Sequence, residues 1–131
     1  MADEPITELL ERFGYPEGVT RIVRPVMELY SVANTWPFQR AVCELTLELI
    51  DKVLKGTLSG READQAFTLL AVFCSEQTLG SALSEEVGEL LREGQELHHY
   101  GDQRFGPDLQ RMRNLAQAYL KGKGNGGQVL P

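Results

Sequence analysis

The chain has 131 residues, of which 42% are hydrophobic and 24% are charged. This length suits one domain with a substantial core, and the composition excludes collagen, a coiled-coil rod, a disulfide-rich miniprotein and wholesale disorder. The net charge of −6 disfavours sequence-independent binding to nucleic acid, because acidic side chains repel phosphate. The charge is uneven, since residues 101–131 carry five basic and two acidic side chains.

The N-terminal segment predicts two short helices. Residues 3–13 carry apolar side chains at helical spacing and end at Gly14, a residue type that commonly terminates helices. After a turn at 15–18, residues 20–33 fit a helix capped by Thr20 or one that begins only at Pro25. The β-branched residues there also fit a strand, but Pro25 argues against a central strand, so we favour the helix.

Two longer helices follow. Pro37 suits the first position of a helix that ends before Gly56, with its charged residues opposite its apolar stripe. Ser59 and Glu62 match a capping box, which predicts a helix over about residues 60–77. Its continuous apolar run at 67–74 predicts burial on nearly all sides, as in the central helix of a bundle. A short buried strand is the alternative for this run.

The next helix is predicted to start at a cap formed by Ser81 or Ser84 and to end at Tyr100. Gly88 and Gly94 lie inside this segment and lower its helix propensity by about 1 kcal/mol each. The same glycines could instead permit a close crossing of two helices.

The last predicted helix begins at Gly106-Pro107 and ends at Gly122. Its predicted apolar stripe consists of Leu109, Met112, Leu115, Ala116, Tyr119 and Leu120. The chain is therefore expected to form an all-α, compact bundle of about five to six helices over residues 1–121, followed by a flexible, Gly-rich tail at 122–131. Predicted starts near 37, 60, 84 and 107 with short loops favour antiparallel neighbours, as in an up-and-down bundle. The even spacing also fits a short solenoid, which is the alternative architecture.

Cysteine usage and the N-terminus predict a cytoplasmic protein. Cys43 and Cys74 lie in apolar segments without Cys-x-x-Cys or paired-histidine spacing, which is typical of buried free thiols in a reducing compartment. The sequence leaves open a disulfide between them. The acidic start does not resemble a signal peptide, and no apolar run approaches the roughly 20 residues that cross a bilayer.

A polar segment at residues 96–102 is the sharpest local motif. Glu96 and His99 have the i, i+3 spacing found in di-iron bundles, but such a site needs a second motif that this chain lacks. We therefore predict no metal site and no cofactor. The segment remains a candidate small-molecule site, and its candidate ligand-binding residues are His98, His99, Tyr100 and Asp102.

Five glutamates between 85 and 96 form an acidic stripe, which fits either a solvated face or a docking surface for a basic partner. The basic residues after 103 could contact nucleic acid or pair with this stripe, because the two helices are consecutive. The candidate partner-binding residues are Glu85, Glu86, Glu89, Glu93, Arg111 and Arg113.

The sequence contains no nucleophile elbow, phosphate-binding loop or other catalytic arrangement. We therefore predict a non-enzymatic protein-binding module, such as an adaptor, assembly subunit, chaperone or inhibitor, that acts through helix surfaces. A homodimer is compatible with this prediction. The alternatives are a bundle that binds a small molecule or metal near His98 and His99, and a regulator that contacts nucleic acid through the C-terminal basic helix.

Overall fold

The computed structural model describes residues 3–31, 34–76, 83–95 and 102–129, with the side chains of 5–31, 34–76, 83–95 and 109–122. These ranges contain six helices and no strand, which confirms the all-α prediction. The helices are α1 (Asp3–Phe13), α2 (Glu17–Met27), α3 (Trp36–Lys55), α4 (Gly60–Glu76), α5 (Glu85–Gly94) and α6 (Asp102–Val129).

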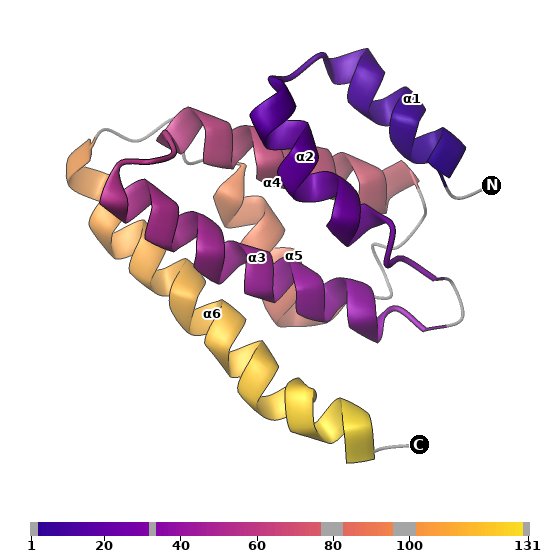
Figure 1. Cartoon of the computed structure of the whole chain (residues 1–131). Coiled ribbons are helices and arrows are strands. Elements are labelled where there is room, and N and C mark those ends of the chain that lie inside the picture. The colour runs from indigo at the N-terminus through magenta and orange to yellow at the C-terminus, as the bar shows by residue number, and fades with distance from the viewer. Residues whose placement is uncertain (1–2, 32–33, 77–82, 96–101, 130–131) are drawn as a thin grey trace.

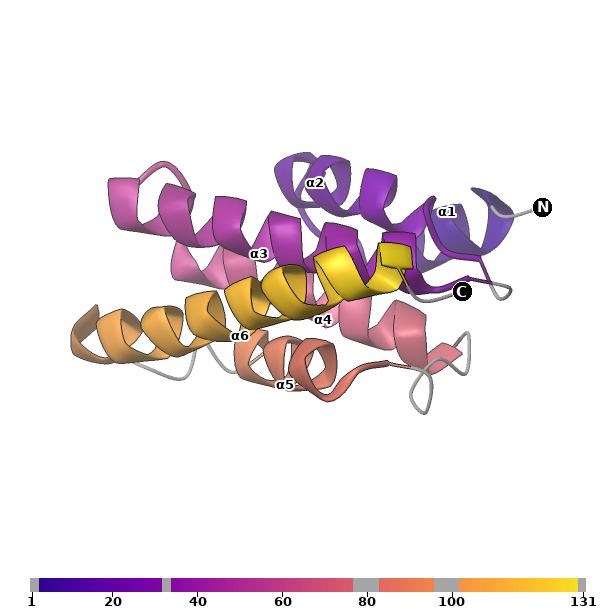
Figure 2. The same ribbon diagram turned by 90° about the horizontal axis from the view of Figure 1, so that it is seen from below.

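Helices α3 to α6 form an up-and-down bundle, because each runs opposite to the one before it (Figure 2). Helix α6 packs along both α3 and α5, and α4 packs against α5, so the bundle closes on itself. This closure favours the predicted bundle over a solenoid, in which repeats stack in one direction. Helices α1 and α2 lie outside the four and cover α4 (Figure 1).

The predicted capping residues act as helix boundaries. The Glu62 backbone N–H donates to Ser59 Oγ at 3.1 Å, and the Ser59 N–H donates to the Glu62 carboxylate at 3.1 Å, which is the reciprocal pair of a capping box. Ser84, rather than Ser81, caps α5 and accepts from the Val87 N–H at 3.3 Å. Gly56 ends α3 at φ +78°, a backbone conformation that glycine adopts without strain.

Helix α2 begins earlier than either predicted start. The backbone N–H groups of Val19 and Thr20 both donate to the Pro16 carbonyl, so the first turn is already formed before Thr20. The Thr20 hydroxyl donates to the Glu17 carbonyl at 3.1 Å, which places this residue inside the first turn rather than at the cap. Pro25 lies in the last turn, where its missing N–H removes only one hydrogen bond before the helix ends at Met27.

The boundaries of the last two helices also differ from the predictions. Helix α5 ends at Gly94 instead of Tyr100, and the backbone and side chain of Gln95 both donate to the Leu91 carbonyl in its last turn. Helix α6 begins at Asp102, a residue type favoured at helix starts, and not at Gly106-Pro107.

The predicted end of α6 at Gly122 is wrong, since the backbone is helical to Val129. Each glycine there lowers helix propensity by about 1 kcal/mol but does not forbid helical dihedral angles. The flexibility expected of residues 122–131 stays a prediction, and residues 130–131 lie outside the described residues.

The apolar stripes predicted from helical spacing form one core. Most of the predicted apolar stripe of α6 is buried, as Leu109, Met112, Ala116 and Tyr119 show. In α4, buried residues lie on most sides of the helix. Cys43 and Cys74 are both buried free thiols, so they do not form the disulfide that the sequence left open. Within the described ranges, no helix has the length and apolarity that crossing a bilayer requires.

Candidate docking groove between α5 and α6

The start of α5 is fixed in place by a buried glutamine of α3. The side chain of Gln39 accepts a hydrogen bond from the Ser84 N–H at 2.8 Å and donates to the Thr35 hydroxyl at 3.0 Å. Gln39 is buried, so these bonds are shielded from water and hold the first turn of α5 against α3. The acidic residues that follow Ser84 are therefore presented from a rigid position.

A groove of about 300 Å³ lies between α5 and α6. Glu85, Glu86 and Glu89 of α5 line one side, and Arg111 and Leu115 of α6 line the other. Leu115 is half-buried and is the apolar residue among these five. A lining that combines three carboxylates with one apolar side chain is suited to a side chain with a hydrocarbon stem and a cationic head.

The glutamates of α5 differ in how their charge is balanced. Glu93 is buried and forms an ion pair with Arg111 of α6. Glu89 pairs with Arg92 on its own helix at 2.6 Å. Among the side chains that the structure describes, Glu85 and Glu86 have no basic partner. Within the described part of the stripe, the carboxylates without a basic side-chain partner thus lie in the first turn of α5.

The negative charge of Glu86 also acts on two buried groups, Tyr119 and Cys43. Burial, with smaller electrostatic contributions from Cys43 and Glu86, raises the pKa of Tyr119 to about 12. Burial likewise raises the pKa of Cys43 to about 12, with smaller contributions from Glu86 and Glu44. A cation bound in the groove would oppose the field of Glu86, so both pKa values would fall.

The structure brings five of the six candidate partner-binding residues together. Glu85, Glu86, Glu89 and Arg111 line the groove, and Glu93 lies beside it through its ion pair with Arg111. This pair confirms, for Arg111, that the basic residues of α6 pair with the acidic stripe. Arg113 is half-buried and does not line the groove.

Leu115 is the groove residue that sequence reasoning assigned only to the core. It belongs to the predicted apolar stripe of α6, and nothing in the sequence distinguishes it from the fully buried members of that stripe. It also lies four residues after Arg111, so the two side chains share one face of α6.

The other candidate site cannot be assembled from the described residues. His98, His99 and Tyr100 lie outside them, and Asp102 is described only as the first residue of α6. Helix α5 ends at Gly94, and Glu96 and His99 lie outside the described residues, so their expected i, i+3 geometry stays a prediction. In the described ranges, no three His, Cys, Asp or Glu side chains are grouped closely enough to hold a metal ion.

Comparison of the chain with protein-family models, with curated protein sequences and with solved structures gives no match in any of the three.

Proposed function

We propose that the protein is a non-enzymatic protein-binding module that takes a basic segment of a partner protein in the groove between α5 and α6. The observation that supports this proposal is the charge balance of the groove. Glu85 and Glu86 face a 300 Å³ cavity without a basic partner among the described side chains, whereas Glu89 and Glu93 are paired internally.

A lysine or arginine of the partner fits this groove chemically. Its hydrocarbon stem would lie on Leu115, and its charged head would reach Glu85 and Glu86. The volume is at the lower end of the range for ligand pockets, so we expect one or two inserted side chains from a short segment. Charges at an exposed rim mainly raise the association rate, so binding should weaken as salt concentration increases.

Native mass spectrometry of the protein purified from its own source tests the proposal. We expect a second polypeptide bound to the 14.6 kDa chain, and we expect the complex to be lost in the variant Glu85→Lys/Glu86→Gln. The control is Glu11→Lys, which alters an exposed glutamate of α1 on another part of the molecule. Circular dichroism would establish that each variant keeps its helices.

A labelled basic peptide provides a second readout that does not depend on the natural partner. Its fluorescence anisotropy should increase on binding to the wild-type chain at low salt and to Glu11→Lys, but not on adding the groove variant. A complex that survives both groove substitutions, or a chain-only mass in every preparation, would contradict the proposal.

A further inference from the structure

The apolar surface of α2 is wider than the part that the core buries. Beside the buried residues of this helix, Ile22 is half-buried and Pro25 and Leu29 are exposed. These three residues have the spacing i, i+3 and i+7, so they form one stripe along the helix, which we call the α2 stripe. Among the side chains that the structure describes, Leu29 and Leu54 are the exposed large hydrophobic ones, at 48% and 58%.

The α2 stripe lines a groove of about 440 Å³ between α2 and α3. Ala41 and Leu45 of α3 add apolar surface to the same groove, and its charged lining residues are Arg21, Glu44 and Glu48. Helix α2 lies outside the four-helix bundle (Figure 1). An amphipathic helix that packs on such a groove buries apolar side chains spaced three and four residues apart, which is the spacing that α2 itself carries.

The charges around this groove are balanced within each helix. Glu44 pairs with Arg40 at 3.1 Å, and Glu48 pairs with Lys52 at 3.3 Å. Residues 17–28 contain two glutamates and two arginines, whereas the whole chain carries a net charge of −6. A strongly charged partner therefore gains little at this surface. A second copy of the chain meets less electrostatic repulsion here than its overall charge would impose.

The order of charges along α2 makes the α2 stripe complementary to itself. Arg21 and Glu28 are seven residues apart, and Glu28 caps the helix with helical dihedral angles, so both lie on one side of α2. In an antiparallel pair of identical helices related by a two-fold axis, the start of each helix lies beside the end of the other. Arg21 of each copy then faces Glu28 of the other, and two equivalent ion pairs result.

Both charges are available for such pairs. Within the chain, Arg21 lies 3.6 Å from Glu17, and Glu28 lies 4.0 Å from Arg24. The side chain of Arg21 is 75% exposed and that of Glu28 is 45% exposed. Exposed ion pairs of this kind contribute little to stability, so exchanging them for pairs between two copies costs little.

We propose that the groove between α2 and α3 is a homodimer interface, in which α2 of a second copy packs antiparallel to α2 about a two-fold axis near Pro25. Leu29 of each copy then lies close to Ile22 of the other. The contact is small, so we expect a dissociation constant on the order of 10–100 µM. In more dilute solution the chain is a monomer in which Arg21 stays exposed. This groove shares no lining residue with the groove between α5 and α6, so the inference does not depend on the proposed partner.

Sedimentation equilibrium of the purified chain tests the dimer. At a concentration of about 1 mM, the average mass should rise from 14.6 kDa toward twice this value. Leu29→Ser should raise the dissociation constant at least about tenfold, because each copy loses a leucine from the contact. Leu54→Ser is the matched control and should leave the dissociation constant unchanged, since Leu54 is also exposed but does not line the groove.

Reversing one charge at a time tests the antiparallel arrangement. Arg21→Glu places carboxylates opposite each other and Glu28→Arg places guanidinium groups opposite each other, so each variant alone should dimerise at least about tenfold more weakly. A mixture of the two variants should form a heterodimer with an affinity close to that of wild type, because opposite charges face each other again in both pairs. Structural damage in either variant would not produce this rescue.

Two further variants control for net charge. Lys121→Glu and Glu11→Lys make the same charge changes at exposed positions on α6 and α1, and neither variant nor their mixture should alter the affinity of the dimer. The proposal is overturned by a chain that stays monomeric at the highest concentration or by a dimer that Leu29→Ser leaves intact. It is also overturned if the mixture of Arg21→Glu and Glu28→Arg associates no more tightly than either variant alone.

Discussion

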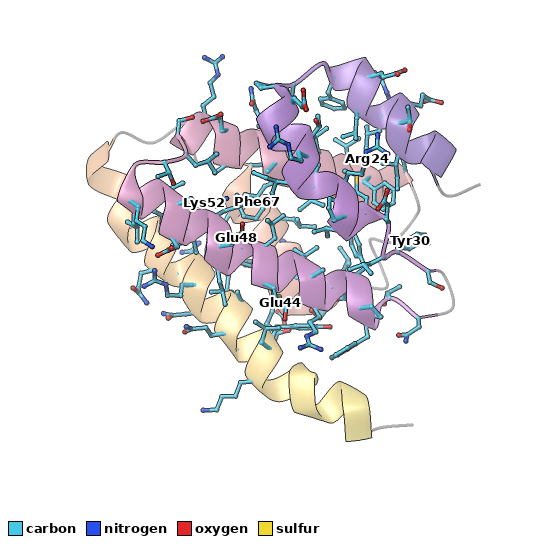
Figure 3. The ribbon with its side chains drawn as sticks, in the orientation of Figure 1. Arg24, Tyr30, Glu44, Glu48, Lys52 and Phe67 are labelled. Atoms are coloured by element: carbon cyan, nitrogen blue, oxygen red, sulfur yellow. The ribbon has the colours of Figure 1, made fainter. Side chains whose placement is uncertain are left out.

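Phe67 of α4 packs directly against the backbone of Gly94 in α5. Phe67 points into the interior of the bundle and is almost fully buried (Figure 3). A Cβ atom placed on Gly94 would lie 2.6 Å from the Phe67 Cβ and closer still to its ring. The crossing of α4 and α5 therefore requires glycine at position 94. Gly88, on the same helix, has nothing within 4 Å of such an atom.

The two glycines should consequently respond in opposite ways to the same substitution. Gly94→Ala should lower the free energy of unfolding by about 1–3 kcal/mol, because the new methyl group overpacks the core around Phe67. Gly88→Ala should raise it by about 0.5–1 kcal/mol, because alanine has the higher helix propensity. Urea denaturation of both variants measures the two effects, and a similar shift in both would contradict the structure.

The ion pair between Arg111 and Glu93 ties α6 to α5. The Glu93 side chain is only 11% exposed and that of Arg111 is 58% exposed, so removing the arginine leaves a nearly buried carboxylate without this partner. We expect Arg111→Ala to lower the free energy of unfolding by about 1–2 kcal/mol, less than for a fully buried pair because water still reaches the arginine.

A double substitution separates the charge from the packing in this pair. Arg111→Ala combined with Glu93→Leu should be more stable than Arg111→Ala alone, since no buried charge is left unpaired. The exposed Arg21 provides the matched control, and Arg21→Ala should change stability by no more than about 0.5 kcal/mol. Equal losses in Arg111→Ala and Arg21→Ala would mean that the pair contributes nothing.

Local patterns in the sequence were sufficient to predict most of the fold. The apolar period of 3.6 residues identified the buried faces, and the side chains of Ser59, Glu62 and Ser84 form the hydrogen bonds that their positions indicated. Opposite charges four residues apart on α3 also form ion pairs, such as Arg40 with Glu44 at 3.1 Å. All these features depend on residues only three or four positions apart.

The groove could not be predicted from local patterns in the sequence. Glu86 and Glu93 are seven residues apart on one helix, so periodicity assigns them the same face. Their environments differ because Arg111, which is 18 residues after Glu93, forms an ion pair with Glu93, whereas it meets Glu86 only across the groove. The close approach of Phe67 to Gly94 is similarly a property of two helices, and the sequence could not decide which glycine made it.

A bidentate ion pair joins the first helix to the end of α4. The guanidinium of Arg12 donates to both carboxylate oxygens of Glu76, at 2.7 and 3.0 Å. These hydrogen bonds, together with the charge of Arg12, hold the pKa of Glu76 below its usual value of 4.5, although burial acts in the opposite direction. Because the folded-state pKa is the lower one, this stabilisation is present above pH 4.5 and is lost as the pH falls through the folded-state value.

The expected consequence is a pH-dependent effect of Glu76→Gln. At neutral pH the variant should be less stable than wild type, and the difference should shrink as the pH is lowered below 4.5, where wild-type Glu76 also becomes protonated. Urea denaturation across this range measures the difference. Both side chains are substantially exposed, so high salt should also reduce it. If wild type and Glu76→Gln differed in stability by the same amount at every pH, the ion pair of Arg12 with Glu76 would not be the cause of the difference.

Alkaline pH should destabilise the protein through groups that are buried in their neutral form. Burial raises the pKa of Cys43 and Cys74 from 9.0 to about 12, and that of Tyr119 from 10.0 to about 12. The unfolded chain therefore loses these protons at lower pH than the folded chain does. The resulting stabilisation is fully present below pH 9.0 and is lost progressively as the pH rises toward about 12.

Two measurements check this expectation and distinguish the groups. The free energy of unfolding from denaturant titrations should fall above pH 9.0 in wild type, and Cys43→Ala/Cys74→Ala should delay the fall until Tyr119 begins to titrate in the unfolded chain near pH 10.0. A thiol reagent should label both cysteines slowly in the folded protein and rapidly in denaturant, because the thiolate is the reactive form. Rapid labelling of Cys43 in the folded chain would show that the interface of α3 and α6 opens around this residue. Burial would then no longer explain the high pKa of Tyr119 in the same interface.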